Sequence, residues 1–265
     1  MEHEVHKHSP QEKAKEGKRP MLVYLAPNLF TTANLFLGFF SIVTSTRAET
    51  PDQWAAAAIA IMVAALADGL DGRVARMTHS ESLFGEQYDS MSDLVSFGVA
   101  PAILLYEWAL MPYGKWGWIA SFMFLTCAAL RLTRFNVLKQ SDEKRYFQGM
   151  PSPVAASIAA SAVIFHEEVN PFHGKDLYIL FVMVMLAITM ISTIRYRSFK
   201  DVKIKSQEGF GYLLIAILVL LLLSMEPEKL LFPMGFLYLL SGPMGYVMSK
   251  AKKKEELLEE ELLEE

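Results

Sequence analysis

The sequence predicts an all-α protein, a helical bundle that crosses a membrane about eight times. Two features of its 265 residues predict this class: 52% are hydrophobic with a mean hydropathy of +0.26, and only 20% are charged. A soluble domain carries more charge, about 25%. The aromatic content of 12% argues against a disordered chain, and the net charge of −4 argues against a nucleic-acid binder. A single cysteine, Cys127, excludes a disulfide framework and a cysteine-rich metal site.

Eight apolar stretches are candidates for the spans, since a helix needs about 20 residues to cross the hydrocarbon core. The first stretch, residues 20–46, contains no charged residue and follows a polar head, so it does not resemble a cleavable signal peptide. The other seven are residues 54–67, 94–106, 116–130, 150–165, 177–194, 210–225 and 230–249. Three of the eight are short unless they include neighbouring charged residues.

The distribution of positive charge supports this count. With the N-terminus in the cytoplasm and eight spans, 21 of the 25 Lys and Arg residues fall on the cytoplasmic side. The external residues are Arg47, Lys115, Lys175 and Lys229. Because cytoplasmic loops carry an excess of Lys and Arg, the asymmetry predicts that both termini are cytoplasmic. A span missed in the middle of the chain would invert the later loops and remove the asymmetry.

The chain divides into three parts by composition. Residues 1–19 are polar and predict a disordered cytoplasmic head, residues 20–249 form the membrane domain, and residues 250–265 form a charged cytoplasmic tail. The leucines of the tail recur at helical spacing, which predicts a solvated or self-associating acidic helix.

Four aspartates lie where membrane helices are normally apolar: Asp68, Asp71, Asp89 and Asp93. A charge in a span is unfavourable by about 2.5–3.5 kcal/mol. The first two aspartates are three residues apart and the last two are four apart, so each pair shares a helix face. A short loop, about residues 77–83, makes the two helices antiparallel. We therefore expect the four carboxylates to converge near the cytoplasmic surface.

Four close carboxylates repel one another, and one or two divalent cations remove that repulsion. Oxygen ligands favour Mg²⁺ or Mn²⁺. Gly72, Ala75 and Gly85 leave room nearby, and Arg73 and Arg76 add positive charge, a combination that suits a phosphate-bearing ligand. Single aspartates at helix ends are often caps or interfacial residues, but four on two helix faces are not explained that way. A transporter that carries metal ions or protons stays open, because spacing alone does not exclude it.

The aspartates belong to a longer pattern, D-x2-D-G-x2-A-R-x8-G-x3-D-x3-D, whose fixed positions are Asp68, Asp71, Gly72, Ala75, Arg76, Gly85, Asp89 and Asp93. The pattern resembles the signature of the CDP-alcohol phosphotransferases. That resemblance implies a membrane helical bundle, usually a homodimer, that displaces CMP from a CDP-linked lipid with an alcohol.

The resemblance also implies roles for individual residues. It makes the four aspartates ligands of two divalent ions, Mg²⁺ or Mn²⁺, with Asp93 also the general base. It implies that the nucleotide and diphosphate pocket is lined by Gly72, Ala75, Arg76 and Gly85. The first span carries Pro27-Asn28-x-x-Thr31-x-x-Asn34, which is similar to the family, and Asn28 and Thr31 are expected to face the CDP group.

Three further segments, residues 129–136, 147–153 and 192–200, resemble the integral-membrane phosphatidylserine synthases of this family. They extend the resemblance over about residues 20–200, and Thr133 and Arg197 depart from the pattern. The implied reaction is CDP-diacylglycerol plus L-serine giving phosphatidylserine and CMP, at the cytoplasmic side of the cell membrane. Glycerol phosphate or an inositol compound as the alcohol, and an archaeal ether lipid as the donor, stay open.

Serine needs a cation for its carboxylate, and Arg131, Arg134 and Asn136 lie at the cytoplasmic level of the aspartates. Each arginine has the alternative role of reaching lipid phosphates. No Ser–His or Cys–His pair is predicted near the aspartates, since His79 lies in the connecting loop. We therefore expect direct attack by the alcohol rather than a covalent phosphatidyl-enzyme.

Overall fold

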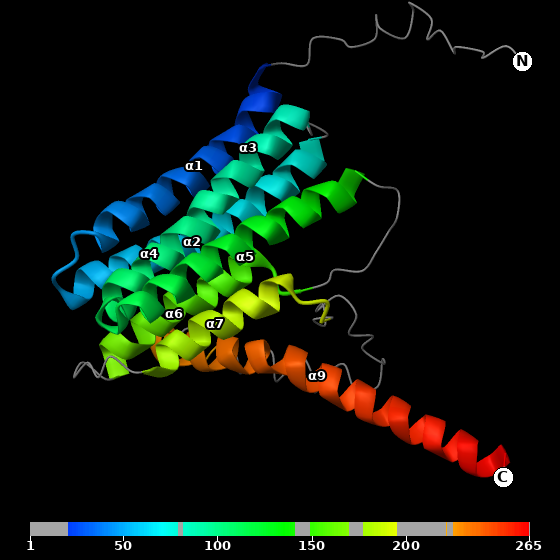
Figure 1. Cartoon of the computed structure of the whole chain (residues 1–265). Coiled ribbons are helices and arrows are strands. Elements are labelled where there is room, and N and C mark those ends of the chain that lie inside the picture. Colours follow the sequence, from blue (N-terminus) through cyan, green and yellow to red (C-terminus); the bar gives the residue numbers. More distant parts are fainter. Residues whose placement is uncertain are drawn as a thin grey trace, which may run out of the picture.

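The computed structural model describes residues 21–78, 82–140, 149–169, 177–194, 221 and 225–264. Every secondary-structure element in these ranges is helical, and none of these residues forms a strand. The α-helices are α1 (Met21–Ser45), α2 (Pro51–Thr78), α3 (Leu83–Asp93), α4 (Ala100–Leu105), α5 (Lys115–Gln140), α6 (Ser152–Val169), α7 (Leu177–Ile191) and α9 (Pro227–Glu264). Figure 1 shows α1 to α5 running side by side along one direction, which confirms the predicted all-α bundle.

Four helical segments among the described residues are long and apolar enough to cross a membrane: Asn28–Ser45, Pro51–Val74, Leu83–Tyr113 and Lys115–Leu138. A shorter apolar helix covers Leu177–Ile191. These segments make the chain an integral membrane protein. The predicted span at residues 210–225 lies almost entirely outside the described residues, so the count of eight and the cytoplasmic termini stay predictions.

Helix α2 is much longer than the apolar stretch that predicted it. Its 28 residues continue without a break through Asp68 and Asp71 to Thr78, a length of about 42 Å at 1.5 Å per residue. Ser82 then begins α3, where its hydroxyl accepts a hydrogen bond from the Gly85 N–H at 3.0 Å. Residues 79–81, inside the predicted connecting loop, lie outside the described residues.

The third span is a helix that contains two π-helical segments. After α3, a π-helical segment covers Leu94–Val99, α4 follows, a second π-helical segment covers Tyr106–Leu110, and a 3₁₀ turn ends at Tyr113. π-Helical turns are rare and occur often at functional sites. The first one begins directly after Asp93.

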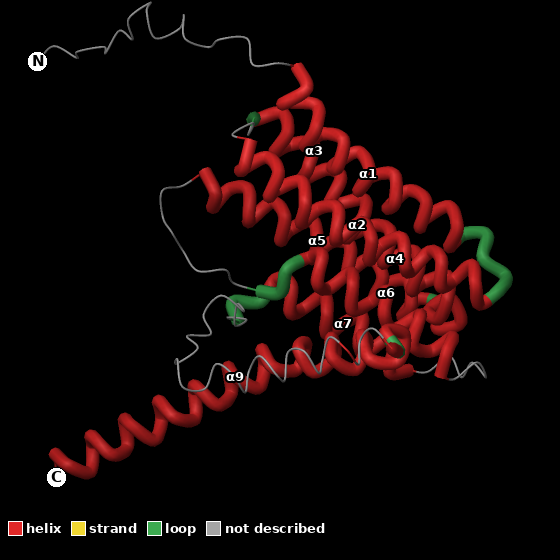
Figure 2. The backbone as a smooth tube through the Cα atoms, turned by 180° about the vertical axis from the view of Figure 1, so that it is seen from behind, coloured by secondary structure: helices red, strands yellow, loops and turns green. Residues whose placement is uncertain are grey.

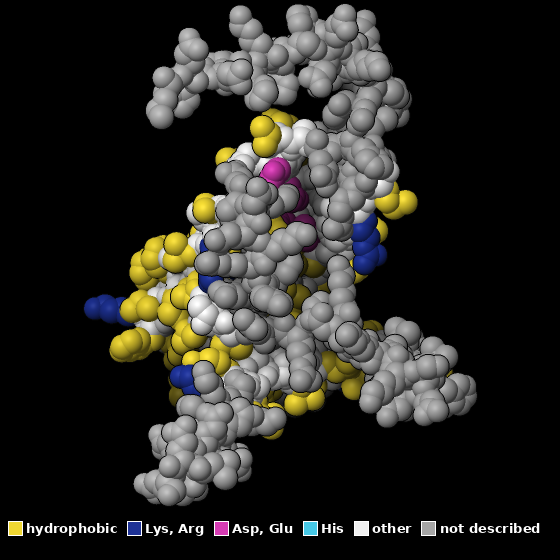
Figure 3. Space-filling model, turned by 90° about the vertical axis from the view of Figure 1, so that its right-hand side faces the viewer, with side chains coloured by type: hydrophobic (Ala, Val, Ile, Leu, Met, Phe, Trp, Pro, Cys, Tyr) yellow, Lys and Arg dark blue, Asp and Glu magenta, His cyan; other side chains and the backbone are white. Residues whose placement is uncertain are grey.

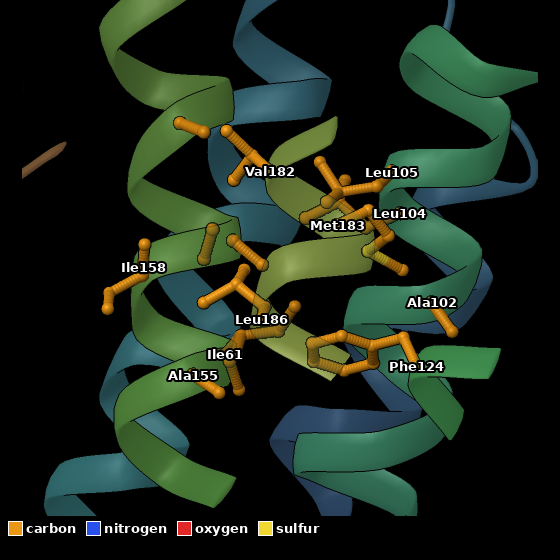
Figure 4. Close-up of a cluster of buried hydrophobic side chains, with 14 of the residues drawn as sticks. Ile61, Ala102, Leu104, Leu105, Phe124, Ala155, Ile158, Val182, Met183 and Leu186 are labelled. Carbon is orange, nitrogen blue, oxygen red and sulfur yellow. The ribbon is translucent and has the colours of Figure 1, made fainter. Parts of the chain in front are cut away.

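The core is built largely from alanines, which let helices approach closely where no aqueous hydrophobic effect drives them together. Helix α2 packs against both α1 and α6, and α5 packs against α7. Figure 4 shows the larger core side chains, including Ile61 of α2, Leu104 of α4, Phe124 of α5 and Leu186 of α7, meeting between these helices. Large apolar side chains such as Phe36 are exposed on the outside of the bundle, where lipid would cover them.

Helix α9 differs from the others in its direction. It crosses the bundle end opposite the N-terminus and then continues beyond the other helices, as the views in Figures 1 and 2 agree. The expected start of the charged tail, residue 250, lies inside this helix rather than at a break in it.

Candidate active site

Three of the predicted aspartates come together in the structure. One carboxylate oxygen each from Asp68, Asp89 and Asp93 lies within 4.8 Å of the other two. Asp68 comes from α2 and the other two from α3, and Asp93 is the most buried of the three. The side chain of Asp71, one turn after Asp68 on α2, lies outside the described residues. Figure 3 shows acidic side chains in a recess on one face of the molecule, at the end nearer the N-terminus.

The donor set fits a divalent cation. Around Mg²⁺, oxygen ligands lie at about 2.0–2.1 Å, so opposite ligands are about 4.2 Å apart. Carboxylate oxygens within 4.8 Å of one another need only small side-chain rotations to reach that span. Oxygen-only ligands suit Mg²⁺ or Mn²⁺ rather than softer metals.

A polar seam joins α1 to the helix that carries Asp89 and Asp93. The Asn34 amide donates from Nδ2 to Oδ1 of Asp93 at 3.0 Å. The Ser92 hydroxyl donates to the Thr31 carbonyl at 3.0 Å, and the Ser96 hydroxyl donates to the Asn34 carbonyl at 2.9 Å. Asp93 is therefore held from the first span as well as from its own helix.

The residues expected to bind the CDP group differ in their surroundings and in how deeply they are buried. Asn28 lies beside Gly85: a Cβ built on Gly85 would be 3.6 Å from the Asn28 Oδ1 atom. A Cβ built on Gly72 would meet no described atom within 4 Å, so the described residues leave space at this position. Thr31, in contrast, is only 4% exposed and lies within the seam between α1 and α3. The side chains of Ala75 and Arg76 lie outside the described residues.

Of the three residues expected to hold serine, Arg131 interacts with two of the carboxylates. Arg131 on α5 is half-buried and interacts electrostatically with Asp93 and Asp68. Its guanidinium donates to the Ser152 hydroxyl at 3.1 Å, and its Nε is buried with no hydrogen-bond partner among the described residues. Arg134 is exposed, one turn further along α5.

Asn136, near the end of α5, is also close to the site, but through a different contact. Its Nδ2 donates to the Ser90 hydroxyl at 2.8 Å, next to Asp89 in the sequence of α3. This bond ties the end of α5 to the helix that carries two of the three carboxylates.

The three segments that resemble phosphatidylserine synthases converge in space. Arg131 of the first segment bonds Ser152 of the second. The Gly149 N–H donates to the Ile194 carbonyl at 2.9 Å, which joins the second segment to the third. Gly149 has φ +83°, and a Cβ on it would lie 2.4 Å from the Met190 carbonyl oxygen, so the turn requires glycine.

Sequence reasoning gave no role to Asn34, Ser90 or Ser152, although it included Asn34 and Ser152 in quoted motifs. A usable signal was present for Asn34, which follows Thr31 by three residues and Asn28 by six on a span without charged residues. Ser152 is fully buried, between two prolines in the sequence.

Comparisons with known proteins agree with this architecture. The model of the CDP-alcohol phosphatidyltransferase family matches residues 24–195. A CDP-diacylglycerol–serine O-phosphatidyltransferase of Helicobacter pylori is 35% identical over 235 residues, 87% of this chain and 94% of that protein. An archaetidylserine synthase of Methanothermobacter thermautotrophicus is 36% identical over 174 residues, 64% of this chain and 68% of that protein. A Mycobacterium leprae protein named CDP-diacylglycerol–serine O-phosphatidyltransferase is 38% identical over 145 residues, 53% of this chain and 47% of that protein.

The family match covers α1 to α7, the helices that build the carboxylate cluster, the α1 seam and the contact between Arg131 and Ser152. The chain therefore belongs to the CDP-alcohol phosphatidyltransferase family.

Proposed function

We propose that the protein transfers the phosphatidyl group of CDP-diacylglycerol to L-serine, which gives phosphatidylserine and CMP. The observation that carries this proposal is the cluster of Asp68, Asp89 and Asp93, within 4.8 Å of one another and beside Arg131. Such a cluster suits a diphosphate held by cations, and the names of the H. pylori and M. leprae relatives support serine as the alcohol. The acyl chains stay in the bilayer, which explains why an integral membrane protein performs the reaction.

Asp68, Asp71, Asp89 and Asp93 are the proposed ligands of one or two divalent cations, Mg²⁺ or Mn²⁺. When bound, such ions offset the negative charge that develops as the phosphorus–oxygen bond to CMP breaks. The carboxylates of the protein supply the charge and the oxygen ligands for this, from α2 and α3, both of which pack against α1.

Asp93 is the proposed general base. The serine hydroxyl is a weak nucleophile at neutral pH and needs a base within hydrogen-bond reach. In the proposed step the serine oxygen forms a bond to the lipid-linked phosphorus and its proton passes to Asp93. The bond from that phosphorus to the oxygen of CMP breaks, and CMP leaves with the electron pair.

The proposed pocket for the CDP group comprises Asn28, Thr31, Gly72, Ala75, Arg76 and Gly85. The open space at Gly72 and the approach of Asn28 to Gly85 support a ligand there. Thr31 contributes by holding α1 against α3, since it is buried in the seam.

Arg131 is the proposed partner of the serine carboxylate. A guanidinium has five N–H donors, and the bond to Ser152 uses one of them. Metal ions would neutralise the nearby aspartates, so the positive charge of Arg131 can attract a further anion. Its planar guanidinium can donate two parallel hydrogen bonds, which suits the carboxylate of serine. Arg134 and Asn136 are proposed as outer members of the same pocket.

The proposed topology has eight spans with both termini and the active site at the cytoplasmic side of the cell membrane. It rests on the 21 of 25 basic residues that this arrangement puts in the cytoplasm. A homodimer is proposed from the family alone.

The test uses purified protein, CDP-diacylglycerol, Mn²⁺ and a panel of alcohols, with CMP release as the readout. We expect serine to support release far above glycerol 3-phosphate or inositol phosphate. A preference for one of those alcohols, or for the CDP-linked ether lipid, would replace the substrate assignment. No release with any alcohol, together with metal or proton flux in proteoliposomes, would favour a transporter.

Two matched arginine variants test the serine pocket. Arg131→Lys keeps the charge but loses the bidentate fork, so the KM for serine should rise about tenfold or more while that for CDP-diacylglycerol changes little. Arg134→Lys, at the outer and exposed part of the same pocket, should raise the KM for serine less, by about two- to threefold, and leave that for CDP-diacylglycerol unchanged. Equal rises in both constants for Arg131→Lys would contradict its assignment to serine.

A further inference from the structure

Asn34 of α1 reaches the carboxylate cluster with its side chain. It is completely buried, and its Nδ2 donates to Oδ1 of Asp93 at 3.0 Å. The two residues are 59 positions apart in the chain. Oδ1 of Asn34 is also buried, and it has no hydrogen-bond partner among the described residues.

A buried acceptor without a partner is unfavourable, because it has lost its hydrogen bonds to water. An apolar residue of the same size would avoid this penalty in the apolar first span. Asn34 therefore contributes little to the stability of the bundle through its oxygen. Its contribution is the N–H that it directs at Asp93.

The backbone around Asn34 is held firmly against the Asp93 helix. The Ser96 hydroxyl donates to the Asn34 carbonyl at 2.9 Å, and the Ser92 hydroxyl bonds the carbonyl of Thr31 one turn earlier. One turn later, Gly38 allows close approach: a Cβ there would lie 2.3 Å from the Ser96 Oγ atom. The α1 backbone before and after Asn34 is therefore held against Ser92 and Ser96, the residues on either side of Asp93 in the sequence.

The terminal torsion of an aspartate is soft, so a single hydrogen bond can set the direction of its carboxylate. We propose that Asn34 is a positioning residue for Asp93: its N–H holds one carboxylate oxygen and so directs the other toward the proton of the acceptor alcohol. This inference rests on the proposed function, in which Asp93 is the general base. Preorganisation of this kind acts on turnover rather than on substrate binding.

The experiment compares Asn34→Leu and Asn34→Ala with Ser45→Ala. Both Asn34 variants lose the donor, and Asn34→Leu keeps the branched shape of the side chain, so kcat should fall about 10- to 100-fold, the range of a hydrogen bond to a charged group, with both KM values within about threefold. Ser45→Ala removes a buried hydrogen bond within the same helix, from the Ser45 hydroxyl to the Ser41 carbonyl, so its kcat should stay within about threefold. Should Asn34→Leu fail to fold, Asn34→Ala carries the test.

A double-mutant cycle with Asp93→Asn separates positioning from general damage. If Asn34 acts through Asp93, adding Asn34→Leu to Asp93→Asn should lower the residual rate by less than about threefold. A loss as large as in the wild-type background would overturn the inference, as would a rise in both KM values with kcat unchanged.

The outcomes for the function and for Asn34 are distinguishable. The cycle needs only CMP release, so it can be run with whichever alcohol the wild-type protein accepts. CMP release with another alcohol but not with serine would refute the substrate and leave the test of Asn34 intact. No CMP release with any alcohol would refute both.

Discussion

Replacement of Asp68 by asparagine should stabilise the protein when no metal is present, although it should abolish most activity. Asp68 brings a negative charge to within 4.8 Å of two others, in a partly buried site. The substitution keeps the size of the side chain and removes the charge. A residue that is unfavourable for stability and needed for function is expected where an active site gathers like charges.

The structure gives the size of the effect. Two unit charges 4.8 Å apart repel by about 3.5 kcal/mol at an effective dielectric constant of 20. Asp68 is repelled by Asp89, but its hydrogen bond with Asp93 and its attraction to Arg131 are weakened or lost at the same time. We therefore expect a net gain of about 1–3 kcal/mol, which corresponds to a rise of about 2–10 °C in melting temperature.

The assay is thermal unfolding in detergent, with EDTA and with Mn²⁺. In EDTA, Asp68→Asn should melt above the wild type, and Mn²⁺ should raise the melting temperature of the wild type more than that of the variant. Asp52→Asn, at the exposed start of the same helix, is the matched control and should not gain stability. If Asp68→Asn melts at or below the wild type in EDTA and responds equally to Mn²⁺, the three carboxylates do not form a metal site.

Two further predictions concern topology and the turn before α6. Single cysteines placed at Lys175 or Lys229 should react with an impermeant label in intact cells, because both positions are expected outside; labelling only after permeabilisation would reverse the orientation. Gly149→Ala should lower the free energy of unfolding by more than about 2 kcal/mol, since its Cβ would meet the Met190 carbonyl at 2.4 Å at φ +83°. Gly245→Ala, where a Cβ meets no atom within 4 Å, is the control; equal melting temperatures for the two variants would contradict the reasoning.

The sequence was sufficient to predict the helical class and the meeting of the aspartates. Hydropathy located the helices, and charge spacing along two antiparallel helices brought Asp68 and Asp93 to one place. These predictions succeed because helical periodicity and a short loop leave little freedom. The ends of the helices were less predictable: α2 continues through its aspartates, which hydropathy alone treats as an end.

The contacts that complete the site could not be predicted in the same way. The bond from Asn34 to Asp93 joins residues 59 apart, and the bond from Arg131 to Ser152 joins helices whose rotation no local pattern fixes. The π-helical turn after Asp93 changes which residues face α1. A prediction that assumes a regular period of 3.6 residues misses this change. Packing between helices, rather than propensity within them, determines these features.

The most direct test of the central claim is the stoichiometry of the reaction. Purified protein is given CDP-diacylglycerol, radiolabelled serine and Mn²⁺, and both CMP and lipid-bound serine are measured. We predict one phosphatidylserine for each CMP, no product in EDTA, and loss of both products together in Asp89→Asn. CMP without labelled lipid, or equal product formation in EDTA, would contradict a metal-dependent transfer to serine.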